Sequence, residues 1–91
     1  MKLKYEFTVM DMGDGEICAV PVGESAKAFR GMLRLNALSA DILEQLKEHT
    51  TPYKIHDSLK ARFPDATDQE IAQELNPFLL TLLKEGLLIM P

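Results

Sequence analysis

The sequence predicts an α+β fold in which a three-stranded antiparallel sheet is followed by three helices. Two observations predict it. Apolar and polar residues alternate in the first third of the chain, with the period of two that half-buried strands show. Apolar residues in the remainder recur at spacings of three and four, as they do along one face of a helix. A length of 91 residues fits a single domain spanning residues 1–91.

Three runs carry the strand pattern. The first covers residues 3–11, and the turn sequence GDGE separates it from a second run, EICAVPV, at residues 16–22. Pro21 lacks an N–H group, so we expect the second strand to end or bulge there. After a predicted loop, GESAK, the third run, AFRGMLRL, covers residues 28–35. We expect an antiparallel meander with this third strand at an edge.

The first two helices are predicted from their N-terminal caps. Asn36 is suited to cap the first helix, which we expect to end near Thr50, although Ser39 offers a competing, later start. Thr51 is suited to cap the second helix, with Pro52 at the first helical position, where a missing N–H group does no harm.

The third helix is the longest. Thr67 or Asp68 is expected to open it, and Glu70 is placed to complete a capping box if Thr67 is the cap. Pro77 deletes one backbone hydrogen bond, so we expect a bend in one helix and not two separate helices. Gly86 can close the helix in the left-handed conformation.

Composition narrows the classes of partner. The 14 acidic and 10 basic residues give a net charge of −4, which repels phosphate backbones and anionic membrane surfaces. A basic partner, or none, is favoured. The single cysteine, Cys18, cannot form an internal disulfide, and no run resembles a signal peptide or is long enough to span a bilayer. We therefore expect a cytoplasmic protein in which Cys18 is buried and inert.

No catalytic or metal-binding constellation is recognisable. The letters HDS at residues 56–58 belong to neighbouring helix positions about 100° apart, which cannot align in a catalytic relay, so we interpret them as a solvated helix flank. His49, His56 and Cys18 do not have the spacing of metal ligands. No glycine-rich loop precedes a helix. We expect no catalytic residue, no metal and no cofactor.

Three segments taken together resemble a known family. VPVG in the second strand, FRGMLRLNALSADIL across the third strand and first helix, and FLLTLLKEGLL near the end are similar to the PqqD-like family, named after coenzyme PQQ synthesis protein D. The resemblance covers nearly the whole chain and depends mainly on hydrophobic spacing around Leu35, Asn36, Leu79 and Gly86. Two departures are Pro77, where helix formers are usual, and Leu43, where many relatives carry an aromatic residue.

The resemblance implies a winged-helix-like module that catalyses nothing. Such modules hold the leader segment of a ribosomally made precursor peptide as an added strand, and present it to a separate modifying enzyme, often a radical SAM enzyme with an iron–sulfur cluster. Carried onto this sequence, the leader lies along the third strand and in a groove beside the third helix. An edge strand with free backbone groups is a template for strand addition.

The peptide-binding residues expected from this are those of the third strand and of one line along the third helix: Phe29, Arg30, Gly31, Met32, Leu33, Arg34 and Leu35, with Ala72, Asn76, Leu79 and Leu83. Each has a plainer interpretation. Arg30 and Arg34 can pair with acidic leader residues or can be solvated charges that protect an edge from aggregation. The helix line can be core. Methionines 10, 12, 32 and 90 can form an adaptable surface or fill gaps in the core.

Two rival functions use the same elements. A winged-helix DNA-binding domain is disfavoured because residues 65–83 contain four acidic residues and no lysine or arginine, and because the five residues after Gly86 are too few for a C-terminal hairpin. A homodimerising scaffold that pairs third strands edge to edge stays open. We expect a monomer or a weak homodimer.

Overall fold

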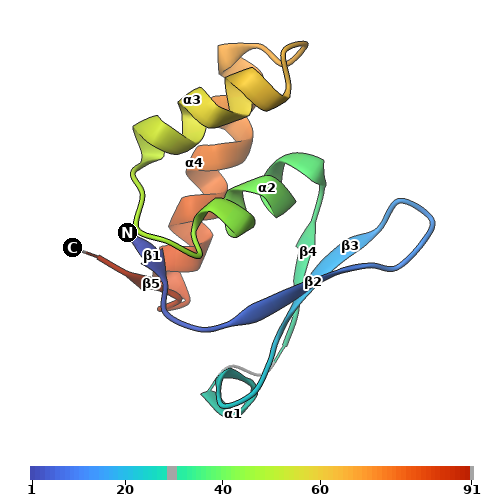
Figure 1. Cartoon of the computed structure of the whole chain (residues 1–91), viewed down its shortest axis with the longest axis vertical. Coiled ribbons are helices and arrows are strands. Elements are labelled where there is room, and N and C mark those ends of the chain that lie inside the picture. Colours follow the sequence, from blue (N-terminus) through green and yellow to red (C-terminus); the bar gives the residue numbers. More distant parts are fainter. Residues whose placement is uncertain (29–30, 91) are drawn as a thin grey trace.

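A three-stranded antiparallel sheet forms one side of the molecule, as predicted. The computed structural model describes residues 1–28 and 31–90 (Figure 1). The strands are β2 (Phe7–Asp11), β3 (Ile17–Pro21) and β4 (Leu33–Leu35), in the order β2-β3-β4. In register, Met10 lies opposite Cys18, and Cys18 lies opposite Arg34. The fold is thus α+β with a meander whose last strand is at an edge, and the winged-helix likeness stays a prediction.

A tight turn joins β2 to β3. Gly13, Asp14 and Gly15 have φ angles of +76°, +54° and +78°, a region that glycine and, less often, aspartate adopt. The Asp11 carboxylate accepts a hydrogen bond from the N–H of Gly13. Figure 1 shows this hairpin projecting away from the helices.

We predicted one strand for the N-terminal run, but the structure has two. β1 (Lys2–Leu3) pairs with β5 (Leu88–Ile89) in a separate two-stranded sheet beside the C-terminal end of α4 (Asp68–Lys84) (Figure 1). The N–H of Leu3 donates to the carbonyl of Leu46 and that of Lys4 to Leu87. These partners are far away in the sequence, so the alternating pattern alone did not show the break.

The predicted GESAK loop contains a short helix, α1 (Ser25–Ala28). Its first residue is tied to the start of β2, because the Ser25 hydroxyl accepts a hydrogen bond from the N–H of Glu6 at 2.8 Å. The loop prediction was therefore wrong for residues 25–27, and the strand prediction was wrong for Ala28, which ends this helix.

The first two long helices begin where their caps predict. In α2 (Ala37–Gln45), Asn36 and Ser39 form a capping box, and in α3 (Pro52–Arg62) the Thr51 hydroxyl accepts from Lys54. However, α2 ends at Gln45 and not near Thr50. The N–H of Thr50 instead donates to the carbonyl of Met1, so the N-terminal segment holds the chain that follows α2.

The longest helix, α4, also has the predicted ends. Thr67 and Glu70 form its capping box, and Gly86 follows it with a φ of +71°. Pro77 lies inside the helix, which runs unbroken through it. The prediction of one helix and not two is therefore confirmed. The expected bend of its axis stays a prediction.

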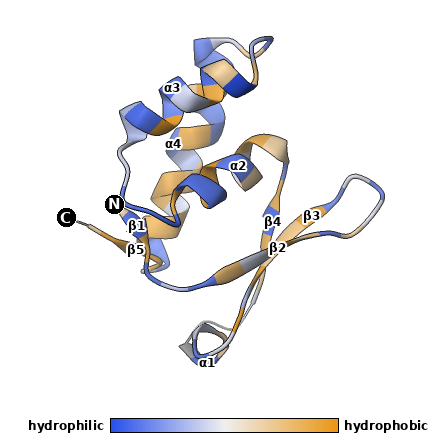
Figure 2. Cartoon of the chain, viewed as in Figure 1, coloured by the Kyte–Doolittle hydropathy of each residue, from blue (hydrophilic) through white to orange (hydrophobic). Residues whose placement is uncertain are grey.

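The core lies where the helices meet the inner face of the sheet. Figure 2 shows apolar residues along β3 and along the lower half of α4, while α3 is mixed. Ala19 on the central strand is fully buried, and Phe7 and Leu35 are nearly so. The largest fully buried side chains are all helical or next to a helix: Ile42, Leu43, Leu46, Ile55, Leu59, Ile71, Leu75, Leu82 and Leu87. Buried Cys18 agrees with prediction, whereas methionines 10, 12, 32 and 90 are 44–56% exposed and fill no core gap.

Candidate functional site

The open side of β4 presents backbone hydrogen-bonding groups. The N–H of Met12 donates to Glu16 and that of Val22 to Glu6, so residues of even number in β3 direct their backbone groups toward β2. Residues 17 and 19 therefore bond to β4, where they face Leu35 and Leu33. Alternation leaves the N–H and C=O groups of Arg34 directed away from the sheet. No strand that the structure describes pairs with this side of β4, so it is an edge of the kind that accepts another strand.

The paired part of this edge is shorter than predicted. Phe29 and Arg30 lie outside the described residues. Gly31 has a φ of +142°, which an extended strand of other residues rarely adopts, and it stands two residues before the first paired residue, Leu33. Pro21, next along β3 toward this end, has no N–H group to offer β4. The strand is therefore confirmed only for residues 33–35.

The two faces of β4 differ in chemistry. Leu33 and Leu35 turn toward the core, in register with Ala19 and Ile17. Arg34 is on the opposite, solvent face, where it is exposed and in register with Cys18. Met32, which has the same parity, is 53% exposed.

A hydrogen bond identifies the flank of α4 that is turned toward β4. Asn36, directly after β4, donates from Nδ2 to Oε1 of Glu74 at 2.6 Å. Phe78 lies one turn further along α4, about 40° around the axis from Glu74. It is partly buried and packs against the same core as Leu33. We call Glu74 and Phe78 the strand-side flank.

The helix line predicted from the sequence lies on other sides of α4. At about 100° per residue, its four members stand about 140–180° around the axis from Glu74: Ala72, Asn76, Leu79 and Leu83. Ala72 follows Asp68 by one turn, and Asp68 faces α3 through His56. Leu79 packs against the core, Asn76 is exposed, and Leu83 is 48% exposed. The structure does not bring these four residues together with Asn36.

The strand-side flank was missed because the sequence of α4 is apolar on several sides. Phe78, Leu79 and Leu80 are consecutive and stand about 100° apart around the helix axis, so a large apolar side chain points in almost every direction. The sequence does not show which side of α4 is turned toward Asn36, because the hydrogen-bond partner of Asn36 is 38 positions away.

The charged residues near the start of α4 form contacts within the fold. His56 Nε2 lies 3.1 Å and Lys60 Nζ 3.7 Å from the Asp68 carboxylate. The hydrogen bond with His56, and then the charge of Lys60, lower the pKa of Asp68. Hydrogen bonds from the backbone and side chain of Thr67 lower the pKa of Glu70. His56 is thus not the solvated residue that we predicted, because it links α3 to α4.

Arg34 differs from these charges. Within residues 1–28 and 31–90 it forms no ion pair and no side-chain hydrogen bond. The open edge therefore carries an exposed guanidinium that the fold itself does not use.

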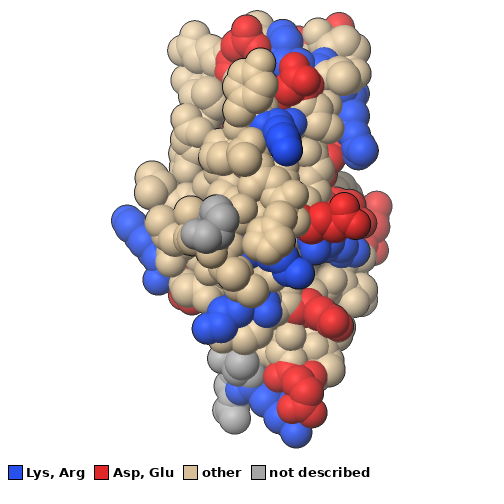
Figure 3. Space-filling view, turned by 60° about the vertical axis from the view of Figure 1, so that its left-hand side comes forward, with Lys and Arg blue, Asp and Glu red and all other residues tan. Residues whose placement is uncertain are grey.

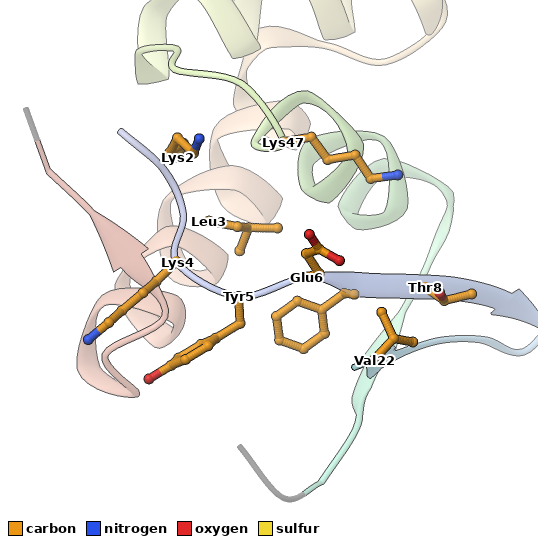
Figure 4. A pocket seen from close by; sticks show the side chains of 9 residues that line it. Lys2, Leu3, Lys4, Tyr5, Glu6, Thr8, Val22 and Lys47 are labelled. Carbon is orange, nitrogen blue, oxygen red and sulfur yellow. The ribbon is translucent and has the colours of Figure 1, made fainter. Parts of the chain in front are cut away.

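A hollow of about 510 Å³ lies at the β2 side of the molecule (Figure 4). The close-up shows the Glu6 side chain beside Leu3 and on the side of the chain that faces Lys47. Lys47 already pairs with Glu44 at 3.1 Å, and Lys4 lies over the Tyr5 ring. None of the predicted site residues lines the hollow.

The described part of the chain contains no cluster of metal ligands. No three His, Cys, Asp or Glu side chains there are grouped so that they could hold a metal ion. None of the helices that the structure describes is long and apolar enough to cross a bilayer.

A known protein family and a solved structure are similar to this chain. The family model "Coenzyme PQQ synthesis protein D (PqqD)" matches residues 9–88. No curated protein matches the chain. Among solved structures, TbiB1 in complex with the TbiA(beta) leader peptide is similar, with a TM-score of 0.63 and 21% identity over 96% of this chain and 93% of TbiB1. At that identity the likeness shows a shared fold. Since the family match extends from within β2 to the start of β5, the chain belongs to the PqqD family.

Proposed function

We propose that this protein captures the leader of a ribosomally synthesised precursor peptide as a fourth strand on β4. It presents that leader to a separate modifying enzyme, a radical SAM enzyme, and catalyses nothing itself. We propose that it does so in the cytoplasm, as its single cysteine leads us to expect. The observation that carries it is the open edge at Arg34, whose backbone N–H and C=O groups are directed away from β3.

The family and its structural neighbour support this proposal. TbiB1 was solved with a leader peptide, and this chain shares its fold over nearly the whole length of both. An added strand on β4 would continue the order β2-β3-β4 by one position.

We also propose that the leader rests on the strand-side flank of α4. Side chains of the added strand that point inward would meet Leu33 and Leu35 on one side and Phe78 on the other. The bond between Asn36 and Glu74 holds β4 and α4 at a fixed separation there. This replaces the line of Ala72, Asn76, Leu79 and Leu83 as the proposed contact on the helix.

Binding to duplex DNA has less support. Before Lys84, α4 contains no cation, and its first turn carries Asp68 and Glu70. On the face shown in Figure 3, basic groups are scattered among acidic ones and form no continuous patch. A second copy of the chain pairing at the same edge is the remaining alternative.

The test is a proline at the edge. Arg34→Pro removes an outward N–H group, while Arg34→Ala keeps it, so the two variants separate the backbone from the side chain. Met32→Pro is less informative because Met32 lies outside the paired part of β4. The probe is a labelled synthetic peptide with the N-terminal sequence of a candidate precursor, chosen from short open reading frames identified by sequencing the neighbouring genes, and it is titrated into each variant.

We expect Arg34→Pro to weaken binding at least about tenfold more than Arg34→Ala, since a lost strand hydrogen bond leaves its partner unsatisfied. Amide shifts should fall on residues 31–35 and around Phe78. Shifts confined to α2 and α3 would contradict the proposal. Size-exclusion at two protein concentrations identifies edge pairing between copies, which would shift the elution with dilution.

A further inference from the structure

In the part of the sheet that the structure describes, the solvent face of β4 carries one cation, Arg34. Met10, Cys18 and Arg34 form one row across the three strands. Cys18 in the middle is only 4% exposed, and Met10 is apolar, so this row offers no acidic partner to Arg34. Glu16, which shares the parity of Cys18, forms no ion pair with Arg34 at 4 Å or less.

An added strand would extend this row by one residue. Directly opposite residues in neighbouring strands place their side chains on the same face, with Cβ atoms about 4.5–5.5 Å apart. The residue opposite Arg34 therefore meets an exposed guanidinium that has no partner in the described chain. The residues before and after it turn to the other face, where Leu33, Leu35 and Phe78 are apolar.

From this alternation we infer that the protein selects a peptide segment in which an aspartate or glutamate lies between two apolar residues, with the carboxylate opposite Arg34. The inference rests on the proposed function and names the class of peptide that this edge binds. It makes Arg34 a residue that determines specificity, in addition to its backbone role.

The selection is local, because the molecule as a whole is acidic. A net charge of −4 does not attract an acidic peptide over long distances. At physiological salt, charges more than about 8 Å apart are largely screened, so the nearest cation decides the preference at each position. Residues 31–35 contain no second cation, so an acidic residue opposite any other residue of this segment is expected to be neutral or disfavoured.

The experiment uses a displayed library of random dodecapeptides, selected in parallel on four forms of the full chain. These are the wild type, Arg34→Glu, Arg34→Pro as a blocked edge, and Lys54→Glu as a matched control. Lys54 is an exposed lysine on α3 with no side-chain partner among the described residues, and its substitution changes the net charge by the same amount as Arg34→Glu.

We expect the wild type and Lys54→Glu to enrich peptides with Asp or Glu at one position between two apolar residues. Arg34→Glu should enrich Lys or Arg at that same position. A peptide selected on the wild type should bind Arg34→Gln about two- to fivefold more weakly at low salt, which is the usual range for one exposed ion pair. That difference should vanish at about 0.5 M salt. If Arg34→Glu does not fold, the library is selected on Arg34→Gln instead, which should lose the preference for Asp or Glu at that position.

Two results would overturn the inference, and they differ in what else they overturn. If the wild type and Arg34→Glu enrich the same consensus, Arg34 does not read the peptide, while strand addition still stands. If the wild type enriches nothing above Arg34→Pro, strand addition fails and the inference fails with it.

Discussion

Asn36 connects three elements through one side chain. Its Oδ1 accepts from the N–H of Ser39 at 2.9 Å and so caps α2, while its Nδ2 donates to Glu74 on α4. The sequence predicts the cap, because a capping bond spans only three residues. It does not predict the bond to Glu74, which depends on how two distant elements pack. The caps at Thr51 and Thr67 were also predicted and confirmed, because each is a local contact. The strand-side flank of α4 was not predicted, because it depends on a distant one.

Asn36→Ala is expected to lower the free energy of unfolding by about 1–2 kcal/mol, because it removes a helix cap. Urea denaturation followed by circular dichroism measures this. Asn36→Ser is the control, since serine caps a helix but is too short to reach Glu74 as asparagine does. Serine should recover most of the lost stability. Equal destabilisation by serine and alanine would mean that the bond to Glu74, and not the cap, carries the effect.

At the scale of elements, the features that depend on neighbouring residues were predicted, and those that depend on distant parts of the chain were not. The turn at residues 13–15, the start of α3 and both ends of α4 follow from local chemistry and were predicted. The break between β1 and β2 was not, because it depends on β5 at the far end of the chain. The contact at the junction of α3 and α4 was not predicted either. His56 was interpreted as solvated, because its partner Asp68 lies 12 positions away on another helix.

This junction makes stability depend on acid pH. The partners of Asp68 lower its pKa below the ordinary 3.8, so the folded state binds the proton more weakly than the unfolded state does. The contribution of Asp68 is therefore present above about pH 4 and is lost as pH falls through the lowered pKa. Glu70 acts in the same direction.

Asp68→Asn is expected to reduce the loss of stability on acidification below about pH 4, and to lower stability slightly at neutral pH. Thermal melts across a pH series measure both effects. Asp65→Asn is the control, because Asp65 is exposed and has no ion pair in the described residues. If both variants flatten the pH profile equally, general charge and not this junction is responsible.

At the scale of the whole molecule, the order of sheet and helices, the family and the edge position of β4 were predicted from the sequence and are confirmed. The side of α4 that belongs with β4 was not, since apolar residues surround that helix and only the packed structure distinguishes its sides. The length of β4 was also overestimated. An alternating pattern at residues 28–35 does not show that Pro21 and Gly31 limit the pairing.

We expect the whole chain to fold without a metal or cofactor. Its core is made of apolar side chains from the sheet and from α2, α3 and α4. The melting temperature should therefore be the same with and without an excess of EDTA, measured by calorimetry on protein purified without metal. A chelator-dependent fall in melting temperature would contradict this, and elemental analysis would then identify the metal.

The shortness of the β4 edge bears on how long a captured peptide stays. Only residues 33–35 pair with β3, and one residue among them, Arg34, directs its backbone outward. A net contribution of about 0.5–1.5 kcal/mol for each hydrogen bond gives such a contact little resistance to dissociation. Differences in affinity among related complexes appear mainly in the off-rate, so residence times here should be brief. If the proposed function holds, we expect a bound peptide to dissociate and rebind many times while a modifying enzyme works, and a processed peptide to leave by simple dissociation.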